Sequence, residues 1–349
     1  MEASCGMDYV RAAFKRDFAD RVPVTVSMGN FQANLSGVSL KEFFTDPNKM
    51  VDTTLHAYDV VRPDIIVATI DLNLETEAIG NELEFIEGGF PLVRKKILEA
   101  DKGVLAKLSV PNPETDGRGP IYLEACKKLS SHFGRETPVA SVVNGPWNIA
   151  ITLRGAEQLI NDTFDDPEFV HEMMTYATEV TKTYTVKLKE TGTGVTMTEA
   201  AASCSLISPQ IYRTFIKPYH MELFEFYKTN KINVSLHICG FIDPILEDVL
   251  ELPINSLSVD SLTSMKLLRD LAGTRIVAIG NVATELYVHG TPEQIEGAVK
   301  EAVDICAKDS AFILSSGCEI PYNSTLDRVL HFVEFGREYG KYEKELAEL

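Results

Sequence analysis

The stretch INVSLHICG, residues 232–240, has the composition of a short buried β-strand and ends in reactive side chains. Branched apolar residues alternate with smaller polar ones, which is a strand pattern, and the glycine at its end marks a turn. The helical pattern DPILEDVLEL (243–252) follows at once. A strand followed directly by a helix is the repeating unit of α/β proteins, so this stretch predicts that fold class.

The same unit recurs along the chain. Seven other β-rich runs alternate with longer stretches in which apolar residues return every three or four positions; these runs are residues 23–29, 65–71, 138–145, 194–200, 256–261, 275–281 and 312–318. Eight strand–helix units in 349 residues predict a (β/α)8 TIM-type barrel, and an open doubly wound sheet is the alternative. No linker rich in Pro, Gly or Ser divides the chain, so we expect one domain over residues 1–349.

Two segments depart from a plain barrel. The residues before the first predicted strand form an N-terminal extension, and residues 72–137 are too long for an ordinary connection after strand 2. That segment contains LEFIEGGFPLV (83–93), which is typical of a hairpin, and the helical pattern GPIYLEACKKLSSHFG (119–134). We expect it to be an insertion over one end of the barrel.

Composition narrows the class of partner. The formal net charge is −18, and an acidic chain repels phosphate backbones and anionic lipid, so we expect neither nucleic acid nor membrane as a partner. The six cysteines are irregularly spaced, and no stretch approaches 18 uninterrupted apolar residues. These features predict reduced thiols and a cytoplasmic protein. Whether the chain forms a homo-oligomer is left open.

Polar residues stand at the carboxyl ends of the predicted strands, where barrel enzymes place their active sites. We take them as the candidate site residues, in chain order Met28, Asn144, Trp147, Glu199, His237, Cys239, Asp260, Asn281 and Cys318. The sequence therefore predicts that the function lies at this end of the barrel.

His237 and Cys239 are the most informative pair among them. Alternate residues of a strand face the same side, so the two side chains leave the strand together, about 6.6 Å apart at the backbone. Cys318 ends the last strand and can join them only over the barrel mouth. One nitrogen and two sulfur ligands with a free fourth position are typical of a catalytic zinc site. A buried histidine and small buried thiols in a core are the alternative.

The chain resembles the uroporphyrinogen decarboxylase superfamily over nearly its whole length, and within it the zinc-dependent methylcobamide:coenzyme M methyltransferases. The segments that carry the resemblance are DRVPV (20–24), ETEAIG (75–80), NGPWNIA (144–150), the SP…KPY run (208–219), SLHICG (235–240), LSVDS (257–261), AIGNV (278–282) and ILSSGCEIP (313–321). The resemblance implies a barrel, and it implies that His237, Cys239 and Cys318 bind Zn²⁺.

The resemblance also implies a reaction. A methyl group would move between a corrinoid, such as methylcobalamin carried on a partner protein, and a thiol such as coenzyme M. We take Glu199 as a candidate fourth zinc ligand. Asp260 is a candidate to orient His237, to contact substrate or to cap a helix. Met28, Asn144, Trp147 and Asn281 are candidates to line the substrate pocket.

Two other reactions remain open at this point. A related enzyme would demethylate a small donor, such as an aryl methyl ether or a methylamine, onto the corrinoid protein. Decarboxylases of the superfamily carry an arginine-rich segment near their start that holds porphyrin carboxylates. The corresponding region here, VSMGNFQANLSG (26–37), contains no arginine, which argues against porphyrinogen decarboxylation. A corrinoid-binding barrel without catalytic activity is the non-enzymatic alternative.

Overall fold

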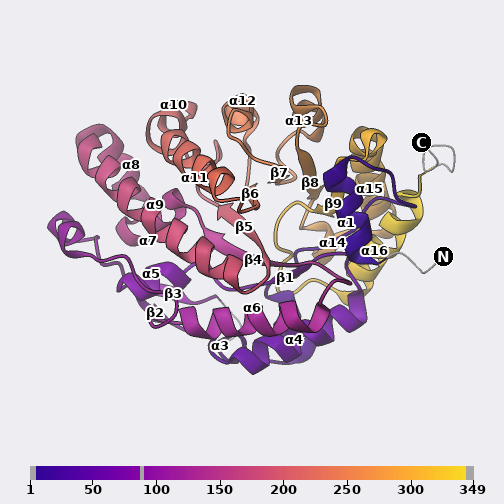
Figure 1. Ribbon diagram of the computed structural model, residues 1–349, viewed down its shortest axis with the longest axis horizontal. Coiled ribbons are helices and arrows are strands. Elements are labelled where there is room, and N and C mark those ends of the chain that lie inside the picture. Colours follow the sequence, from indigo (N-terminus) through magenta and orange to yellow (C-terminus); the bar gives the residue numbers. More distant parts are fainter. Residues whose placement is uncertain (1–4, 87–89, 343–349) are drawn as a thin grey trace.

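Seven parallel strands form a curved sheet at the centre of the protein, in the computed structural model, which describes residues 5–86 and 90–342. Their spatial order is β1-β4-β5-β6-β7-β8-β9, so within this sheet the strands follow one another in chain order (Figure 1). The strands are β1 (Ile66–Ala68), β4 (Val139–Asn144), β5 (Gly194–Glu199), β6 (Val234–Ile238), β7 (Ser256–Val259), β8 (Val277–Val282) and β9 (Phe312–Ser316). Seven of the eight predicted strands are therefore present, most of them one to three residues shorter at an end.

The first predicted strand, residues 23–29, is not a regular strand. Its backbone nevertheless lies between the two edges of the sheet, because Leu314 of β9 donates to the Pro23 carbonyl and Asp64, just before β1, donates to the Val24 carbonyl. Pro23 has no N–H to give, and the Ser27 N–H bonds to the Ser316 hydroxyl, so a continuous ladder cannot form. The arrangement is a curved α/β sheet consistent with a TIM-like barrel.

Helices surround the outside of the sheet (Figure 1). The α-helices are α1 (Gly6–Lys15), α2 (Phe31–Ser36), α3 (Leu40–Thr45), α4 (Pro47–Val61), α5 (Leu74–Ile79), α6 (Gly119–Phe133), α7 (Pro146–Arg154), α8 (Ala156–Asp165), α9 (Pro167–Glu190), α10 (Pro209–Ile211), α11 (Lys217–Thr229), α12 (Leu246–Leu250), α13 (Met265–Ala272), α14 (Leu286–His289), α15 (Pro292–Cys306) and α16 (Leu326–Tyr339). Short 3₁₀ turns are η1 (Lys102–Lys107), η3 (Asp243–Ile245) and η4 (Ala307–Asp309), and η2 (Tyr212–Ile216) is a π-helical turn. Thr291 caps α15 in a capping box with Gln294, and Pro292 stands in the first turn, where its missing N–H breaks no helical bond.

The long connection between β1 and β4 contains α5, an antiparallel hairpin, η1 and α6. The hairpin strands are β2 (Glu82–Glu84) and β3 (Leu92–Lys95), so the hairpin pattern in 83–93 is confirmed, although residues 87–89 of its turn lie outside the described residues. Helix α6 covers the predicted helical stretch 119–134 closely.

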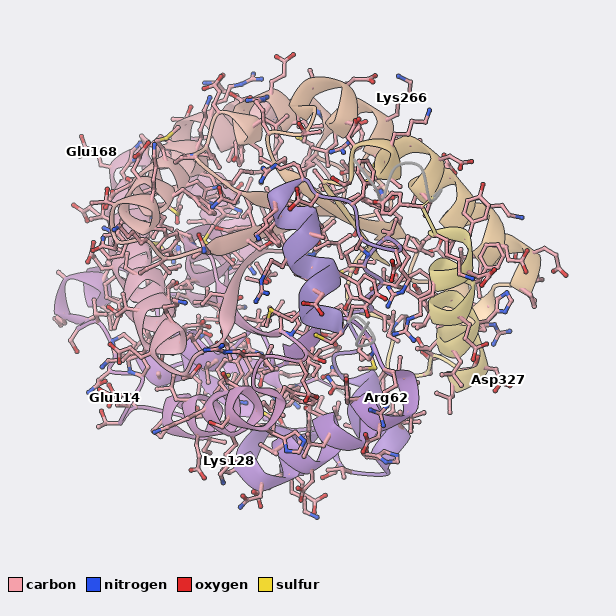
Figure 2. All side chains as sticks on the ribbon, turned by 45° about the vertical axis from the view of Figure 1, so that its right-hand side comes forward. Arg62, Glu114, Lys128, Glu168, Lys266 and Asp327 are labelled. Carbon is pink, nitrogen blue, oxygen red and sulfur yellow. The ribbon has the colours of Figure 1, made fainter. Side chains whose placement is uncertain are left out.

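The core is one large cluster of buried apolar side chains that runs from Val22 to Val333. At the amino-terminal ends of β8 and β9, Val10 and Ala13 of α1 pack on Val277 and Ile313. Figure 2 shows this helix lying across the strands. Helix α1 therefore covers the amino-terminal ends of these strands, and the carboxyl-terminal end of the sheet is available for a functional site. Among residues 5–86 and 90–342, no helix is both long and apolar enough to span a membrane.

Candidate metal centre

Three side chains at the carboxyl end of the sheet meet at one point. His237 Nε2 lies 3.2 Å from Cys239 Sγ, which lies 3.5 Å from Cys318 Sγ. The ligand atoms of all three residues fall within 4.8 Å of one another. Tetrahedral zinc with bonds of about 2.0–2.3 Å holds its ligand atoms about 3.3–3.8 Å apart, so this donor set and spacing fit a zinc ion. His237 lies on β6, Cys239 comes directly after β6, and Cys318 comes just after β9, with β7 and β8 between these two strands in the sheet.

Two glycines let the chain pass closely enough to bring the cysteines together. Gly240, directly after Cys239, has φ +72°, and a Cβ there would lie 2.6 Å from Ser205 Oγ. A Cβ at Gly317, directly before Cys318, would lie 2.7 Å from the Ser261 amide nitrogen. A side chain at position 317 would collide with backbone, and one at position 240 would be strained by the positive φ, so glycine is favoured beside both candidate ligand cysteines.

Ser258 orients the histidine. It stands directly opposite His237 in the β6–β7 register, and its Oγ lies 2.9 Å from His237 Nδ1. That contact leaves Nε2 free to face the two sulfurs. The sequence predicted Asp260 as a candidate for this role, and the structure places Ser258 at that nitrogen instead. Only the pairing of residues between β6 and β7, which cannot be read from the sequence, identifies Ser258.

We expect Ser258→Ala to weaken metal binding about 10–100-fold, because residues that orient a metal-binding histidine contribute that much. A chelator competition titration measures the change. Ser256→Ala is the matched control, since Ser256 lies on the same strand but bonds to Ser235 rather than to the histidine. Equal affinities for the two variants would exclude the orienting role.

The two thiols of the metal-free centre share one negative charge. The hydrogen bond from Cys239 lowers the pKa of Cys318 to about 4, although burial opposes this, and His237 adds to the lowering. The same hydrogen bond, together with burial, raises the pKa of Cys239 well above its usual range. Burial lowers the pKa of His237, but the Cys318 thiolate outweighs it and the net shift is upward. The two buried sulfurs therefore favour holding one proton between them at neutral pH.

Metal affinity should consequently rise with pH through the neutral range. An ion that binds Cys239 must displace its proton, because the raised pKa keeps this thiol protonated there. One displaced proton corresponds to about a ten-fold gain in affinity per pH unit. Zinc titrations between pH 6.5 and 8.5, with proton release followed by a pH indicator, test this; an affinity independent of pH would contradict it.

Glu319 is a further acidic group beside the centre that the sequence reasoning did not single out. Its Oε1 accepts the backbone N–H of Asn30 at 2.9 Å, and a Cβ at Gly29 would overlap its carboxyl group. Burial raises the pKa of Glu319 to about 7. The segment after residues 23–29 thus folds over Glu319 and connects the first predicted strand to the metal centre.

Glu199 lies at the end of β5, fully buried, and is not in the three-residue cluster. Its oxygens accept the backbone N–H groups of Trp147 and Asn148 at the start of α7, and its Oε1 lies 2.9 Å from His220 Nε2. The proposed ligand role stays a prediction, and in this conformation it would require Glu199 to leave all three partners.

Asp260 and Asn281 organise the loops around the centre. The Asp260 carboxylate accepts the Leu262 amide and the Ser261 hydroxyl. Asn281 donates through Nδ2 to the carbonyls of Asp260 and Thr263. Both side chains therefore have structural partners, and their predicted contacts with substrate are not tested by this geometry.

The remaining predicted pocket residues are nearly inaccessible. Met28 is 3% exposed, Asn144 is 4% exposed and Trp147 is completely buried. Trp147 donates its indole N–H to the Ala201 carbonyl, and Asn144 binds the buried Glu75 carboxylate through both its backbone and side-chain N–H groups. A direct substrate contact by any of these three residues stays a prediction.

A buried ion pair lies at the end of β1, in the same layer of loops. Arg118 binds both carboxylate oxygens of Asp71, and its Nε donates to Glu77 at 2.6 Å. Arg118 is 5% exposed and Asp71 is 2% exposed. The sequence placed Asp71 at a strand end, but its partner is 47 residues away and only the fold brings the two together.

The sequence model for uroporphyrinogen decarboxylase matches residues 6–339. The chain belongs to this family. A methylcobamide:CoM methyltransferase, MtbA of Methanosarcina acetivorans, is 25% identical over 337 residues, which are 94% of this chain and 96% of that protein. A methylated-thiol–coenzyme M methyltransferase of Methanosarcina mazei is 25% identical over 295 residues, covering 84% of this chain and 77% of that protein.

A solved structure supports the same relationship. The structure of a methyltransferase from Methanosarcina mazei superimposes with a TM-score of 0.86 at 25% identity, covering 97% of this chain and 99% of that one. A uroporphyrinogen decarboxylase of Prochlorococcus marinus is also similar, at 23% identity over 331 residues. Proteins named as methyltransferases and as decarboxylases are both similar to this chain, so the choice between the two activities depends on the site.

Proposed function

We propose that this family member is a zinc-dependent methyltransferase that moves a methyl group from a corrinoid protein to a thiol acceptor such as coenzyme M. The observation that carries the proposal is the meeting of His237, Cys239 and Cys318 at the carboxyl end of the strands. Relatives named as methylcobamide:CoM methyltransferases support it. All six cysteines are unpaired, which agrees with a reducing, cytoplasmic setting.

The three ligands suit activation of a thiol. With zinc bound there, an added substrate thiol would ionise and be kept as a nucleophilic thiolate. His237, held by Ser258, and the two cysteines would fix where that sulfur lies. Positioning the sulfur in line with the methyl carbon contributes on the order of 7–11 kcal/mol to catalysis, more than ionisation alone.

The methyl transfer needs no oxidant or reductant besides the thiol and the methylated corrinoid. The thiolate sulfur donates an electron pair to the methyl carbon, forming a thioether. The carbon–cobalt bond breaks and its electron pair stays on cobalt, which goes from Co(III) to Co(I). The thiol proton is released to solvent before the transfer.

Metal analysis followed by a methyl-transfer assay tests the proposal. Freshly purified protein should contain about one zinc per chain, because the site offers one set of three ligands. It should convert methylcobalamin to cob(I)alamin only when a thiol is present, and a panel of thiols that includes coenzyme M identifies the acceptor. An active protein that contains no zinc and is indifferent to chelators would refute the proposal.

The same assay separates the alternatives. Methylation of cob(I)alamin by methoxyaromatics or methylamines, without reaction of thiols, would establish the reverse direction. Porphyrinogen decarboxylation requires no metal, so decarboxylation of a porphyrinogen by protein stripped of all zinc would favour that reaction.

A further inference from the structure

Three loops beside the metal centre present large apolar side chains to solvent. Leu206 is 47% exposed, Phe241 is 39% exposed and Leu262 is 63% exposed. They follow β5, β6 and β7, which are neighbours in the sheet (Figure 1). Phe241 is two residues from the metal-binding Cys239. We call these three side chains the apolar strip.

Hydrogen bonds between the loops hold the strip in place. The Phe241 amide donates to Ser205 Oγ, and the Phe241 carbonyl accepts from the Cys204 amide, which ties the first two loops together. Thr263 connects the second and third loops, since its Oγ1 donates to the Gly240 carbonyl and accepts from the Ile242 amide. The strip is therefore a pre-formed surface, and its exposed apolar area is the kind that marks a binding site.

The charge around the strip favours one kind of occupant. Loop segments 203–206, 239–242 and 260–263 contain no lysine or arginine, and Asp260 gives the last one a carboxylate. Arg213, which lies near Cys204, is neutralised by its ion pair with Asp248. A methyl–Co(III) corrin has a broad apolar macrocycle and carries one positive charge, so it matches both features.

We propose that the apolar strip docks the methyl-bearing face of the corrin ring that the carrier protein presents. This inference rests on the proposed function and adds the surface on which the methyl donor is held. Three adjacent strands span about 10 Å at a spacing of about 4.8 Å, a width that suits one edge of a macrocycle. A ring seated there would lie beside Cys239, which would bring its methyl group towards a thiol held at the metal centre.

The double variant Leu206→Ser with Leu262→Ser tests the strip, because both side chains are exposed and their loss leaves the loop hydrogen bonds intact. Free methylcobalamin presents the same ring and serves as the probe; its dissociation constant is measured by sedimentation, with zinc-loaded and with metal-stripped protein. We expect the constant to rise about ten-fold or more, since both leucine side chains would lose apolar surface that the ring buries. Zinc content should not change.

Phe164→Ser is the matched control. Phe164 is 75% exposed but belongs to α8 and to none of the three loops of the strip, and this variant should bind methylcobalamin like the wild type. Wild-type and double-variant proteins with equal affinity, or a wild type that does not bind the probe, would overturn the inference. A wild type that binds the ring through the strip but transfers no methyl group to any thiol would refute the proposed function alone.

Discussion

Cys318→Ala is expected to leave the purified protein with almost no bound zinc and no thiol-dependent methyl transfer. The substitution removes one of the three candidate ligands found among the described residues, and it also removes the thiolate that holds His237 through a hydrogen bond and through charge. Changes to residues that merely orient a ligand cost about 10–100-fold in affinity, so loss of a ligand itself should exceed roughly 100-fold. Elemental analysis and a chelator competition measure the effect.

Cys204→Ala provides the control for general effects of removing a thiol. This cysteine is half-buried and lies outside the three-residue cluster. Its variant should keep wild-type zinc content. If Cys318→Ala retained stoichiometric zinc with undiminished affinity, the metal centre as described here would be wrong.

The second large effect is expected on stability. Arg118→Met should lower the free energy of unfolding by about 3–5 kcal/mol, because it leaves the Asp71 carboxylate buried without its partner. Urea unfolding followed by circular dichroism measures the loss. The combined variant Arg118→Met with Asp71→Asn removes both charges and should recover most of it, as expected for two residues that interact directly.

An exposed ion pair gives the comparison. Lys128, at the edge of the molecule in Figure 2, pairs with Glu124 one helical turn away, and both side chains are largely in solvent. Lys128→Met should change stability by less than about 1 kcal/mol. If Arg118→Met lowered the free energy of unfolding no more than Lys128→Met does, the buried Asp71 carboxylate would need its partner no more than an exposed carboxylate does.

Local sequence patterns were sufficient for the strands that lie inside the sheet. The run 232–240 contains β6, and six others contain or nearly contain their strands, because alternation of branched apolar residues is a local property. The run 23–29 has the same composition but does not form a regular strand. Its Pro23 carbonyl and its Ser27 N–H pair with the Leu314 N–H and the Ser316 hydroxyl of β9, which only the closure of the sheet brings near.

The metal cluster was predictable for a related reason. A histidine and a cysteine separated by one residue share a face of their strand wherever that strand lies, and a cysteine at another strand end shares its layer once the strands are parallel. The sequence by itself therefore determined the β–α alternation and the three candidate ligands. Tertiary structure alone decided that Ser258 orients His237, that Glu199 is bound by the start of α7 and His220, and that Arg118 meets Asp71. These contacts depend on strand register and on the path of long connections, which are set by packing between distant segments rather than by any neighbouring residues in the chain.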